Sequence, residues 1–275
     1  MSAGQRTTKR TAEIGVFGGS GFYAFLDDVV EVPVHTPYGA PSAPVAIGTV
    51  EGRSVAFLPR HGKDHELPPH KVNYRANVWA MREVGVRRIF GPCAAGSLQP
   101  LVHPGDFVVL DQLVDRTWGR ADTFFDGGVV GHVSFADPYC PELRSVLKEA
   151  GAGIDVAVRD GGTVVVIQGP RFSTRAESNF YRSFGWEVIN MTQYPEAFLA
   201  RELGICYAGL ALITDYDTGL EGVDGIAPVT IDVVFEVLRR NVARTRDLLF
   251  AAIPRVAESA ACSCADALSS GPLSS

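Results

Sequence analysis

Two aspartates follow the most apolar run of the sequence and suit proton transfer. Asp215 and Asp217 come just after Tyr207–Ile213. Side chains alternate in an extended chain, so both carboxylates should project to the same side. One of these two neighbouring carboxyls lies at the end of an apolar strand. Its pKa should therefore be raised, which would make it a general acid near neutral pH. An aspartate pair that only caps a turn is the alternative interpretation.

A glycine-rich turn near the N-terminus is suited to an anion. Gly18–Gly21 has only small residues, so backbone N–H groups and the Ser20 hydroxyl can approach a ligand closely. A third glycine and a following lysine are both missing at the required spacing, which argues against dinucleotide-binding and P-loop motifs. A tight strand-to-helix turn without a ligand is the other interpretation.

A cationic pair follows another predicted strand. Arg60 and His61 lie at its carboxyl end, where open α/β sheets place ligands, and arginine suits bidentate contact with phosphate. His61 and His65 have the spacing of a metal pair on a helix. Gly62 and Pro68 make a helix there unfavourable, so no metal site is expected. An ordinary hydrogen-bonded surface pair is the alternative for the histidines.

Two further segments combine polar and small residues at predicted strand ends. Gly91–Ser97 exposes backbone donors. In Asn190–Glu196, Thr192 offers a hydroxyl near a helix start, and Met191 presents a flat, polarizable side chain to a sugar or base, or is plain core. Several anion-friendly strand ends favour one shared pocket.

The five cysteines do not suggest a disulfide framework or a metal site. Cys93, Cys140 and Cys206 lie in apolar or strand-like segments, where cysteine behaves as a small hydrophobe, and they should be reduced. Cys262 and Cys264 form a C-x-C that lacks a second pair at metal spacing. An incidental surface pair is expected for them, with a redox-sensitive bridge as the alternative.

Strand and helix patterns alternate along the chain. The predicted strands are Glu13–Phe17, Val45–Thr49, Val55–Leu58, Arg88–Phe90, Phe107–Leu110, Thr163–Ile167, Glu187–Ile189 and Tyr207–Ile213. The predicted helices are Asn73–Val84, Pro141–Ala150, Pro195–Leu203 and a long one from N-cap Thr230 to a stop before Pro254. This order predicts an α/β fold with a mixed, mostly parallel central sheet flanked by helices.

Bulk properties predict one enzyme-sized domain. The 275 residues, 46% of them hydrophobic, can bury one core, assigned here to 13–264 with flexible tails at 1–12 and 265–275. A net charge of −6 argues against a nucleic-acid surface. No apolar segment resembles a signal peptide or a membrane span, so a cytoplasmic location is expected. The polar, glycine-rich segment Arg120–Val133 predicts a long mobile loop.

The chain resembles the methylthioadenosine phosphorylase branch of the trimeric nucleoside phosphorylases. The similarity covers about Ile14 to Val256 and is strongest in the motifs PRHGKDHELPPHKVNYRAN, IQGPRFSTRAES, NMTQYPEAFLARE and TDYD. It implies a homotrimer without organic cofactor or metal, with inorganic phosphate as co-substrate. It implies phosphate binding by Ser20, Arg60, His61, Cys93, the Ala94 backbone and Thr192. It implies a nucleoside site of Phe172, Ser173, Met191, Asp215, Asp217, His65, His132, Ile231 and Phe235, with His132 reaching the neighbouring subunit's site.

The base pocket favours adenine over a 6-oxopurine. Asp215 can accept from a 6-amino group and, when protonated, donate to N7. The relatives selective for hypoxanthine and guanine carry Asn there and Glu where this chain has Ser173. The resemblance therefore implies phosphorolysis of 5′-methylthioadenosine to adenine and 5-methylthioribose 1-phosphate, a step of purine and methionine salvage.

Other functions remain open at this point. The nearest is a phosphorylase that prefers adenosine or a 6-oxopurine nucleoside such as inosine or methylthioinosine. A nucleosidase that uses water would leave Arg60 and Thr192 unexplained. A non-catalytic nucleotide-binding protein would need a dinucleotide motif that Gly18–Gly21 does not supply.

Three departures from the family pattern concern the edges of the site. Cys93 stands where a Thr hydroxyl is usual, so one phosphate contact should be weaker. Phe235 replaces a usual Leu at the 5′-alkylthio pocket, near Val229 and Ile231, which should make the pocket smaller. The loop between Asp217 and Val229 is longer than in close relatives.

Overall fold

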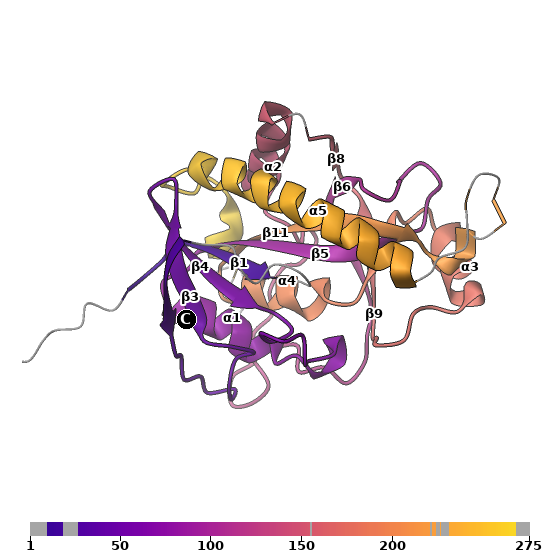
Figure 1. The fold of residues 1–275 in the computed structure, drawn as a ribbon. Coiled ribbons are helices and arrows are strands. Elements are labelled where there is room, and N and C mark those ends of the chain that lie inside the picture. Colours follow the sequence, from indigo (N-terminus) through magenta and orange to yellow (C-terminus); the bar gives the residue numbers. More distant parts are fainter. Residues whose placement is uncertain are drawn as a thin grey trace, which may run out of the picture.

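One mixed sheet of eleven strands organises the molecule (Figure 1). The computed structural model describes residues 10–18, 27–154, 156–220, 222–223, 226 and 231–267. The strands are β1 (Ile14–Gly18), β2 (Asp27–Val32), β3 (Val45–Val50), β4 (Arg53–Pro59), β5 (Arg88–Ser97), β6 (Phe107–Val109), β7 (Gln112–Arg116), β8 (Val158–Asp160), β9 (Thr163–Ile167), β10 (Val188–Asn190) and β11 (Cys206–Tyr216).

Strand β5 is the centre of the sheet, because it pairs with three neighbours. It runs parallel to β1 and to β11, whereas its last residues, Gly96 and Ser97, pair antiparallel with Ile189 and Val188 of β10. The remaining parallel pairs are β1 with β4, β9 with β10, β7 with β9 and β6 with β8. The predicted mixed, mostly parallel α/β sheet is confirmed.

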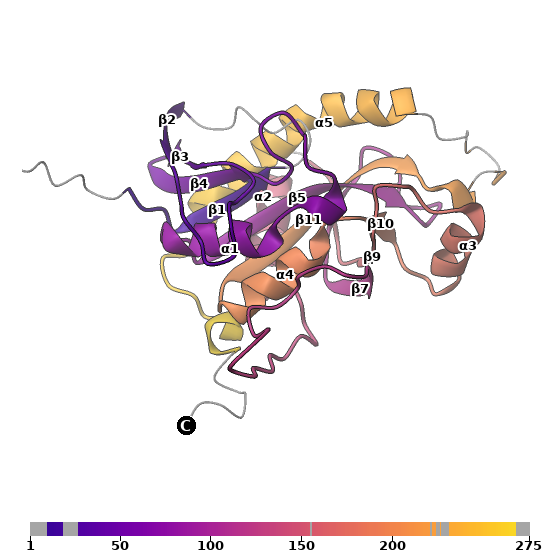
Figure 2. The same cartoon turned by 90° about the horizontal axis from the view of Figure 1, so that it is seen from below.

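Helices cover both faces of this sheet (Figures 1 and 2). Helices α1 (Tyr74–Glu83) and α4 (Gln193–Glu202) pack on one face, and α2 (Pro141–Gly153) and α5 (Ile231–Ala252) on the other. Nine consecutive β11 residues from Cys206 to Thr214 are buried, as expected for a strand covered on both faces. Helix α3 (Arg175–Ser183) lies at one end, over a small cluster around Leu98 and Tyr181.

The predicted strands and helices are all present, with small differences at their ends. Four 3-10 turns, η1 (Pro69–Lys71), η2 (Thr218–Leu220), η3 (Ile253–Arg255) and η4 (Ser263–Asp266), complete the described elements. In α4, Tyr194 has non-helical φ and ψ, so the regular turns begin at the predicted Pro195. Elements β2, β7, β8 and α3 were not predicted from the sequence, and the predicted N-cap Thr230 lies outside the described residues.

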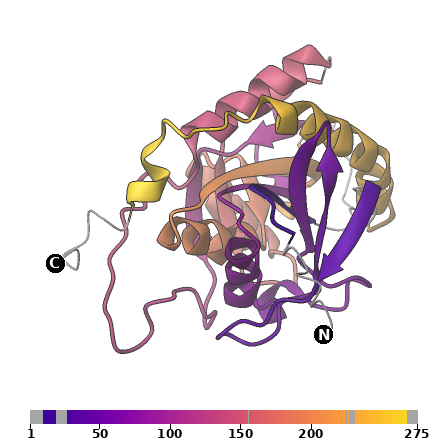
Figure 3. The same ribbon diagram turned by 90° about the vertical axis from the view of Figure 1, so that its left-hand side faces the viewer.

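The chain ends and the long loop frame the folded region. Ala12 and Ala267 are buried, so the packed structure extends past both predicted tail boundaries; 1–9 and 268–275 lie outside the described residues. Arg120–Val133 has no regular element apart from an isolated bridge between Gly127 and Val129, and the segment between β7 and α2 stands away from the body in Figure 3. None of the described helices is long and apolar enough to cross a membrane.

Candidate active site

The predicted site residues gather around one pocket. Its walls include Arg60, His61, His65, Cys93, Ala94, Phe172, Ser173, Met191, Thr192, Asp215 and Asp217. They come from segments far apart in the sequence, and the antiparallel approach of β10 explains how they meet. Because β10 runs back along the end of β5, the residues that follow it return to the level of Ala94. The ends of β4, β5, β10 and β11 therefore face one space.

Four predicted site residues are not placed in this pocket. Ser20 lies outside the described residues, and the side chains of Ile231 and Phe235 on α5 are also outside the description. His132 is exposed on the long loop and does not line the pocket of its own chain. This exposed position is compatible with the expectation that His132 serves a neighbouring subunit.

Asp215 has the electrostatics of a general acid. Burial and the nearby Asp217 carboxylate raise the pKa of Asp215 to about 6, although a 2.6 Å hydrogen bond from the Thr214 hydroxyl opposes the change. The predicted raised pKa is therefore confirmed in direction. About a tenth of the Asp215 carboxyls carry a proton at pH 7 with such a pKa.

Asp217 and Ser173 form a fixed pair beside Asp215. The Ser173 hydroxyl donates to Oδ2 of Asp217 over 2.7 Å, and both residues are buried. Gly96 leaves the space for both aspartates. A Cβ at Gly96 would lie 3.3 Å from Oδ2 of Asp215 and 3.1 Å from Cγ2 of Ile189. Position 96 of β5 therefore requires glycine, because a larger residue would crowd the side chains of Asp215 and Ile189.

The Arg60 side chain is held by a buried network that the sequence analysis did not find. Its Nε and Nη2 donate to the two carboxylate oxygens of Glu196, each over 2.6 Å, and Nη1 donates to the Pro92 carbonyl oxygen. Tyr207 also donates its hydroxyl to Glu196 over 2.6 Å. The bidentate partner of Arg60 is thus Glu196, so only the two remaining N–H groups of the guanidinium are left for a pocket ligand.

His61 is an uncharged side chain at neutral pH. Burial and the Arg60 charge lower the pKa of His61 to about 4. Its Nδ1 lies 2.8 Å from the Leu67 carbonyl oxygen, so the neutral ring donates there and keeps Nε2 as an acceptor. The ring of His65 lies 4.5 Å from that of His61, centroid to centroid. Both rings line the pocket, which disfavours a plain surface pair.

Residues within β5, at the end of β10 and just after it complete the polar wall. Burial raises the pKa of the Cys93 thiol to about 11, so it is a neutral, weak donor. Thr192 is the N-cap of α4, yet its side chain makes no capping hydrogen bond. Asn190, which sequence reasoning did not select, is buried and lines the pocket. Neither polar atom of its amide has a hydrogen-bond partner within the described residues.

Met191 forms an apolar part of the pocket wall beside Gly169. A Cβ on Gly169 would lie 2.6 Å from the Met191 sulfur, and Gly169 has a positive φ of 63°. Phe172, which also lines the pocket, is 61% exposed and so has room for a further apolar partner. Within the described residues, the one cluster able to hold a metal consists of four cysteines outside this pocket.

The comparison with known proteins places the chain among the phosphorylases. The model of the phosphorylase superfamily matches residues 13–254, so the chain belongs to this family. It is 57% identical to the S-methyl-5′-thioadenosine phosphorylase of Mycolicibacterium smegmatis over 244 residues, 88% of this chain and 91% of that relative. It is 53% identical to the purine nucleoside phosphorylase of Streptomyces coelicolor over 270 residues, 94% of this chain and 95% of that relative.

Solved structures show the same fold. A methylthioadenosine phosphorylase from an antarctic soil metagenomic library has a TM-score of 0.88 and 42% identity, over 94% of this chain and 91% of that one. The methylthioadenosine phosphorylase from Schistosoma mansoni in complex with adenine has a TM-score of 0.87 and 36% identity, over 94% and 96%.

Proposed function

We propose that this chain catalyses the phosphorolysis of 5′-methylthioadenosine to adenine and 5-methylthioribose 1-phosphate. The observation that carries the proposal is the position of Asp215, whose pKa is about 6, beside the buried Ser173–Asp217 pair in one pocket. The relatives named S-methyl-5′-thioadenosine phosphorylase support the choice of nucleoside.

The reaction exchanges one bond at the anomeric carbon. A phosphate oxygen forms a bond to C1′ while the bond from C1′ to N9 of adenine breaks, through an oxocarbenium-like state. The electron pair of that bond passes into the base, and Asp215 supplies a proton to N7, so adenine leaves neutral. Phosphate is the nucleophile, and no oxidant or reductant enters the balance. The balance therefore needs no redox cofactor, and our proposal includes neither an organic cofactor nor a catalytic metal.

Several donors are available for phosphate in this proposal. They are the two remaining N–H groups of Arg60, the Thr192 hydroxyl, the Ala94 backbone N–H and the Cys93 thiol. We also assign a phosphate contact to the Ser20 hydroxyl, which lies outside the described residues. The acceptor Nε2 of neutral His61 suits a protonated phosphate oxygen rather than a charged one. Because Glu196 offsets the charge of Arg60, orientation of the phosphate rests largely on neutral donors.

Base selectivity follows from the carboxylates. In our proposal, Asp217, already an acceptor for Ser173, and Asp215 face the 6-amino and N7 edge. A 6-oxopurine would set a carbonyl oxygen against a carboxylate acceptor, and a buried unmatched polar group costs about 1–3 kcal/mol. The expected preference is for adenine nucleosides, with Met191 under the ribose and Phe172 over the base.

The decisive experiment is adenine release from methylthioadenosine with and without inorganic phosphate. Adenosine and inosine serve as parallel substrates. Phosphate-dependent release, fastest on methylthioadenosine and weak on inosine, is the expected result. Release without phosphate would identify a nucleosidase, and a preference for adenosine or inosine would identify a different purine nucleoside phosphorylase. Asp215→Asn should abolish most turnover with an unchanged circular dichroism spectrum, and full activity of that variant would remove Asp215 from the mechanism.

We further propose a cytoplasmic homotrimer in which His132 completes the neighbouring site. Support comes from the exposure of His132 and of the apolar Val129 and Val130 on the same loop. The five cysteines are free, which suits a reducing compartment.

A mixing experiment tests the shared site. His132→Ala and Asp215→Asn chains, each nearly inactive alone, are co-expressed with different tags and purified as mixed trimers. If His132 acts across the interface, each mixed trimer has one of its three sites with both native residues, and activity returns to about a third of that of the native trimer. Absence of recovery in verified mixed trimers would place His132 in its own chain's site or outside catalysis.

A further inference from the structure

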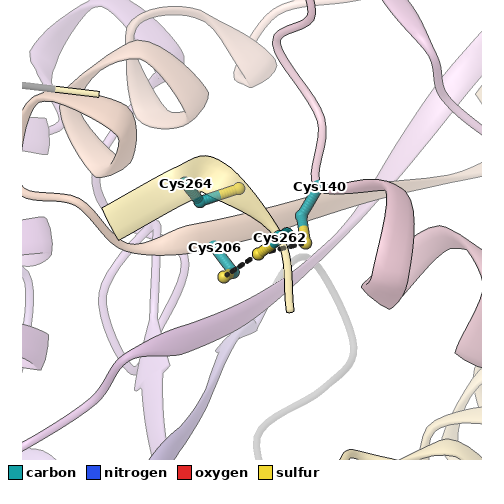
Figure 4. Close-up of side chains that lie close together, drawn as sticks. All are labelled: Cys140, Cys206, Cys262 and Cys264. Carbon is teal, nitrogen blue, oxygen red and sulfur yellow. Dashed lines mark hydrogen bonds between the residues drawn. The ribbon is translucent and has the colours of Figure 1, made fainter. Parts of the chain in front are cut away.

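Four of the five cysteines meet at one point, although they are far apart in the sequence (Figure 4). Cys206 begins β11, Cys140 is the N-cap of α2, and Cys262 and Cys264 flank the start of η4. All four sulfur atoms lie within 4.8 Å of one another. The expected surface pair at the C-x-C is therefore wrong, because Cys264 is buried and the fold supplies the second pair that the sequence seemed to lack.

The sulfur distances fit a shared ion better than separate bridges. Sγ of Cys262 lies 3.3 Å from that of Cys206 and 3.6 Å from that of Cys140. Tetrahedral zinc with Zn–S bonds of about 2.3 Å places its sulfurs roughly 3.8 Å apart. A disulfide instead brings two sulfurs to about 2.05 Å and satisfies them in pairs. Here Cys262 approaches two partners at once, and all four thiols are free.

The surroundings of the cluster suit a closed site. Cys140, Cys206 and Cys264 are buried, whereas Cys262 is partly exposed and offers a route for an ion from solvent. Cys140 stands at the N-terminus of α2, a helix of 13 residues whose positive end favours a thiolate. The cluster is also remote from catalysis. Cys206 and Asp215 lie near opposite ends of β11, which separates them by roughly 30 Å in an extended strand.

We propose that Cys140, Cys206, Cys262 and Cys264 bind one zinc ion as a structural site. Binding replaces four S–H bonds by four Zn–S bonds and releases four protons, with no change in oxidation state. Four protein ligands leave no open position for water or substrate, so the ion has no part in phosphorolysis. Its role is to tie the C-terminal segment, residues 261–267, to β11 and α2.

Metal content and thiolate coordination test this site without reference to activity. Untagged protein is purified anaerobically, with a reductant, from zinc-supplemented cells. Inductively coupled plasma mass spectrometry should then find one zinc ion per chain. Zinc-free protein titrated with Co²⁺ should develop a thiolate-to-cobalt charge-transfer absorption that saturates at one equivalent. Zinc removal should lower the melting temperature, and zinc should restore it.

Substitutions assign the ligands. Cys262→Ser, at the most exposed ligand, and Cys206→Ser should each lose most of the bound zinc and the cobalt absorption. Cys93→Ser is the matched control, because it removes a cysteine outside the cluster and should keep the metal. If a variant fails to fold, the cobalt titration of the native sequence still decides.

Two results would overturn the proposal. One is reduced protein with four titratable cluster thiols that shows no thiolate absorption with Co²⁺. The other is anaerobically purified, zinc-free protein whose intact mass shows one or two disulfides among these cysteines. Both outcomes are independent of whether the chain cleaves methylthioadenosine.

Discussion

The Asp215 carboxyl titrates close to neutral pH because the fold both buries it and places Asp217 nearby. If its protonated form is the acid, kcat/KM for methylthioadenosine at saturating phosphate should fall as pH rises above about 6. Asp217→Asn removes the charge that helps raise this pKa, so the descending limb should move to lower pH. The measurement is the pH profile of both proteins. An unmoved limb in the variant would show that another group controls it.

The Glu196 carboxylate balances the charge of the buried Arg60 guanidinium, so its removal should lower the free energy of unfolding. Glu196→Gln leaves the Arg60 guanidinium buried at 1% exposure without its counter-charge, which should cost about 3–5 kcal/mol of unfolding free energy. Phosphate should then raise the melting temperature more in the variant than in the native protein, because it supplies a replacement anion.

The control for this variant is Tyr207→Phe. It removes one hydrogen bond to Glu196 but keeps the ion pair, so it should cost only about 0.5–1.5 kcal/mol and leave the phosphate effect unchanged. Thermal unfolding of the three proteins over a phosphate series separates the effects. An equal phosphate effect in all of them would mean that Arg60 does not face the anion.

The sequence predicted the positions of single side chains where those positions depend on local backbone geometry. Alternation along an extended chain predicted that Asp215 and Asp217 share a side, and both line the pocket. The Arg60–Glu196 pair joins residues 136 positions apart, so no local pattern indicates it. Asn190 was within a segment of interest, but only the fold shows that its amide is buried without a partner in the described part of the chain.

At the scale of elements, apolar strands were predictable and polar ones were not. β7 has no buried residue, so its sequence lacks the hydrophobic run that marks an interior strand. Helix α3 did carry a local signal that was overlooked. Thr174 and Glu177 form a capping box, each side chain accepting from the other's backbone N–H, and this pattern directly follows Ser173.

The close pairing of β5 with β10 and β11 makes Gly96 a sensitive position. Gly96→Ala would press a methyl group against Ile189 and the Asp215 carboxylate, so we expect about 1–3 kcal/mol less stability and at least tenfold lower kcat. Urea unfolding and steady-state kinetics measure the two effects. Gly153→Ala in α2 is the control, since the nearest atom to its new methyl is the mobile end of Arg255. Native kinetics in Gly96→Ala would mean that the carboxylate position is not critical.

The arrangement of the whole molecule followed from the alternation of strands and helices, but the branching of the sheet did not. Sequence patterns give the order of elements along the chain, whereas the antiparallel approach of β10 to the end of β5 depends on contacts between distant segments. The convergence of four cysteines from three parts of the chain has the same origin.

Association is the property of the whole molecule that the long loop should control. Val130 is 64% exposed in the single chain. If the loop packs on a neighbouring subunit, Val130→Asp buries a charge there and should weaken association at least tenfold, with Val130→Ala as the apolar control. Sedimentation velocity over a dilution series measures this. Identical profiles for both variants and the native chain would place the loop outside any interface.

The partnership of β5 with β11 also has a consequence for the time at which function appears during synthesis. Every β5 residue from Arg88 to Ser97 pairs with a residue between Cys206 and Tyr216. In a growing chain, the β5 edge that pairs with β11 therefore stays unpaired until β11 leaves the ribosome. Long-range pairing of this kind delays folding. A nascent chain that stops before Cys206 therefore exposes the edge of β5 and lacks the β11 wall of the pocket, so the risk of aggregation is greatest between the emergence of β5 and the emergence of β11.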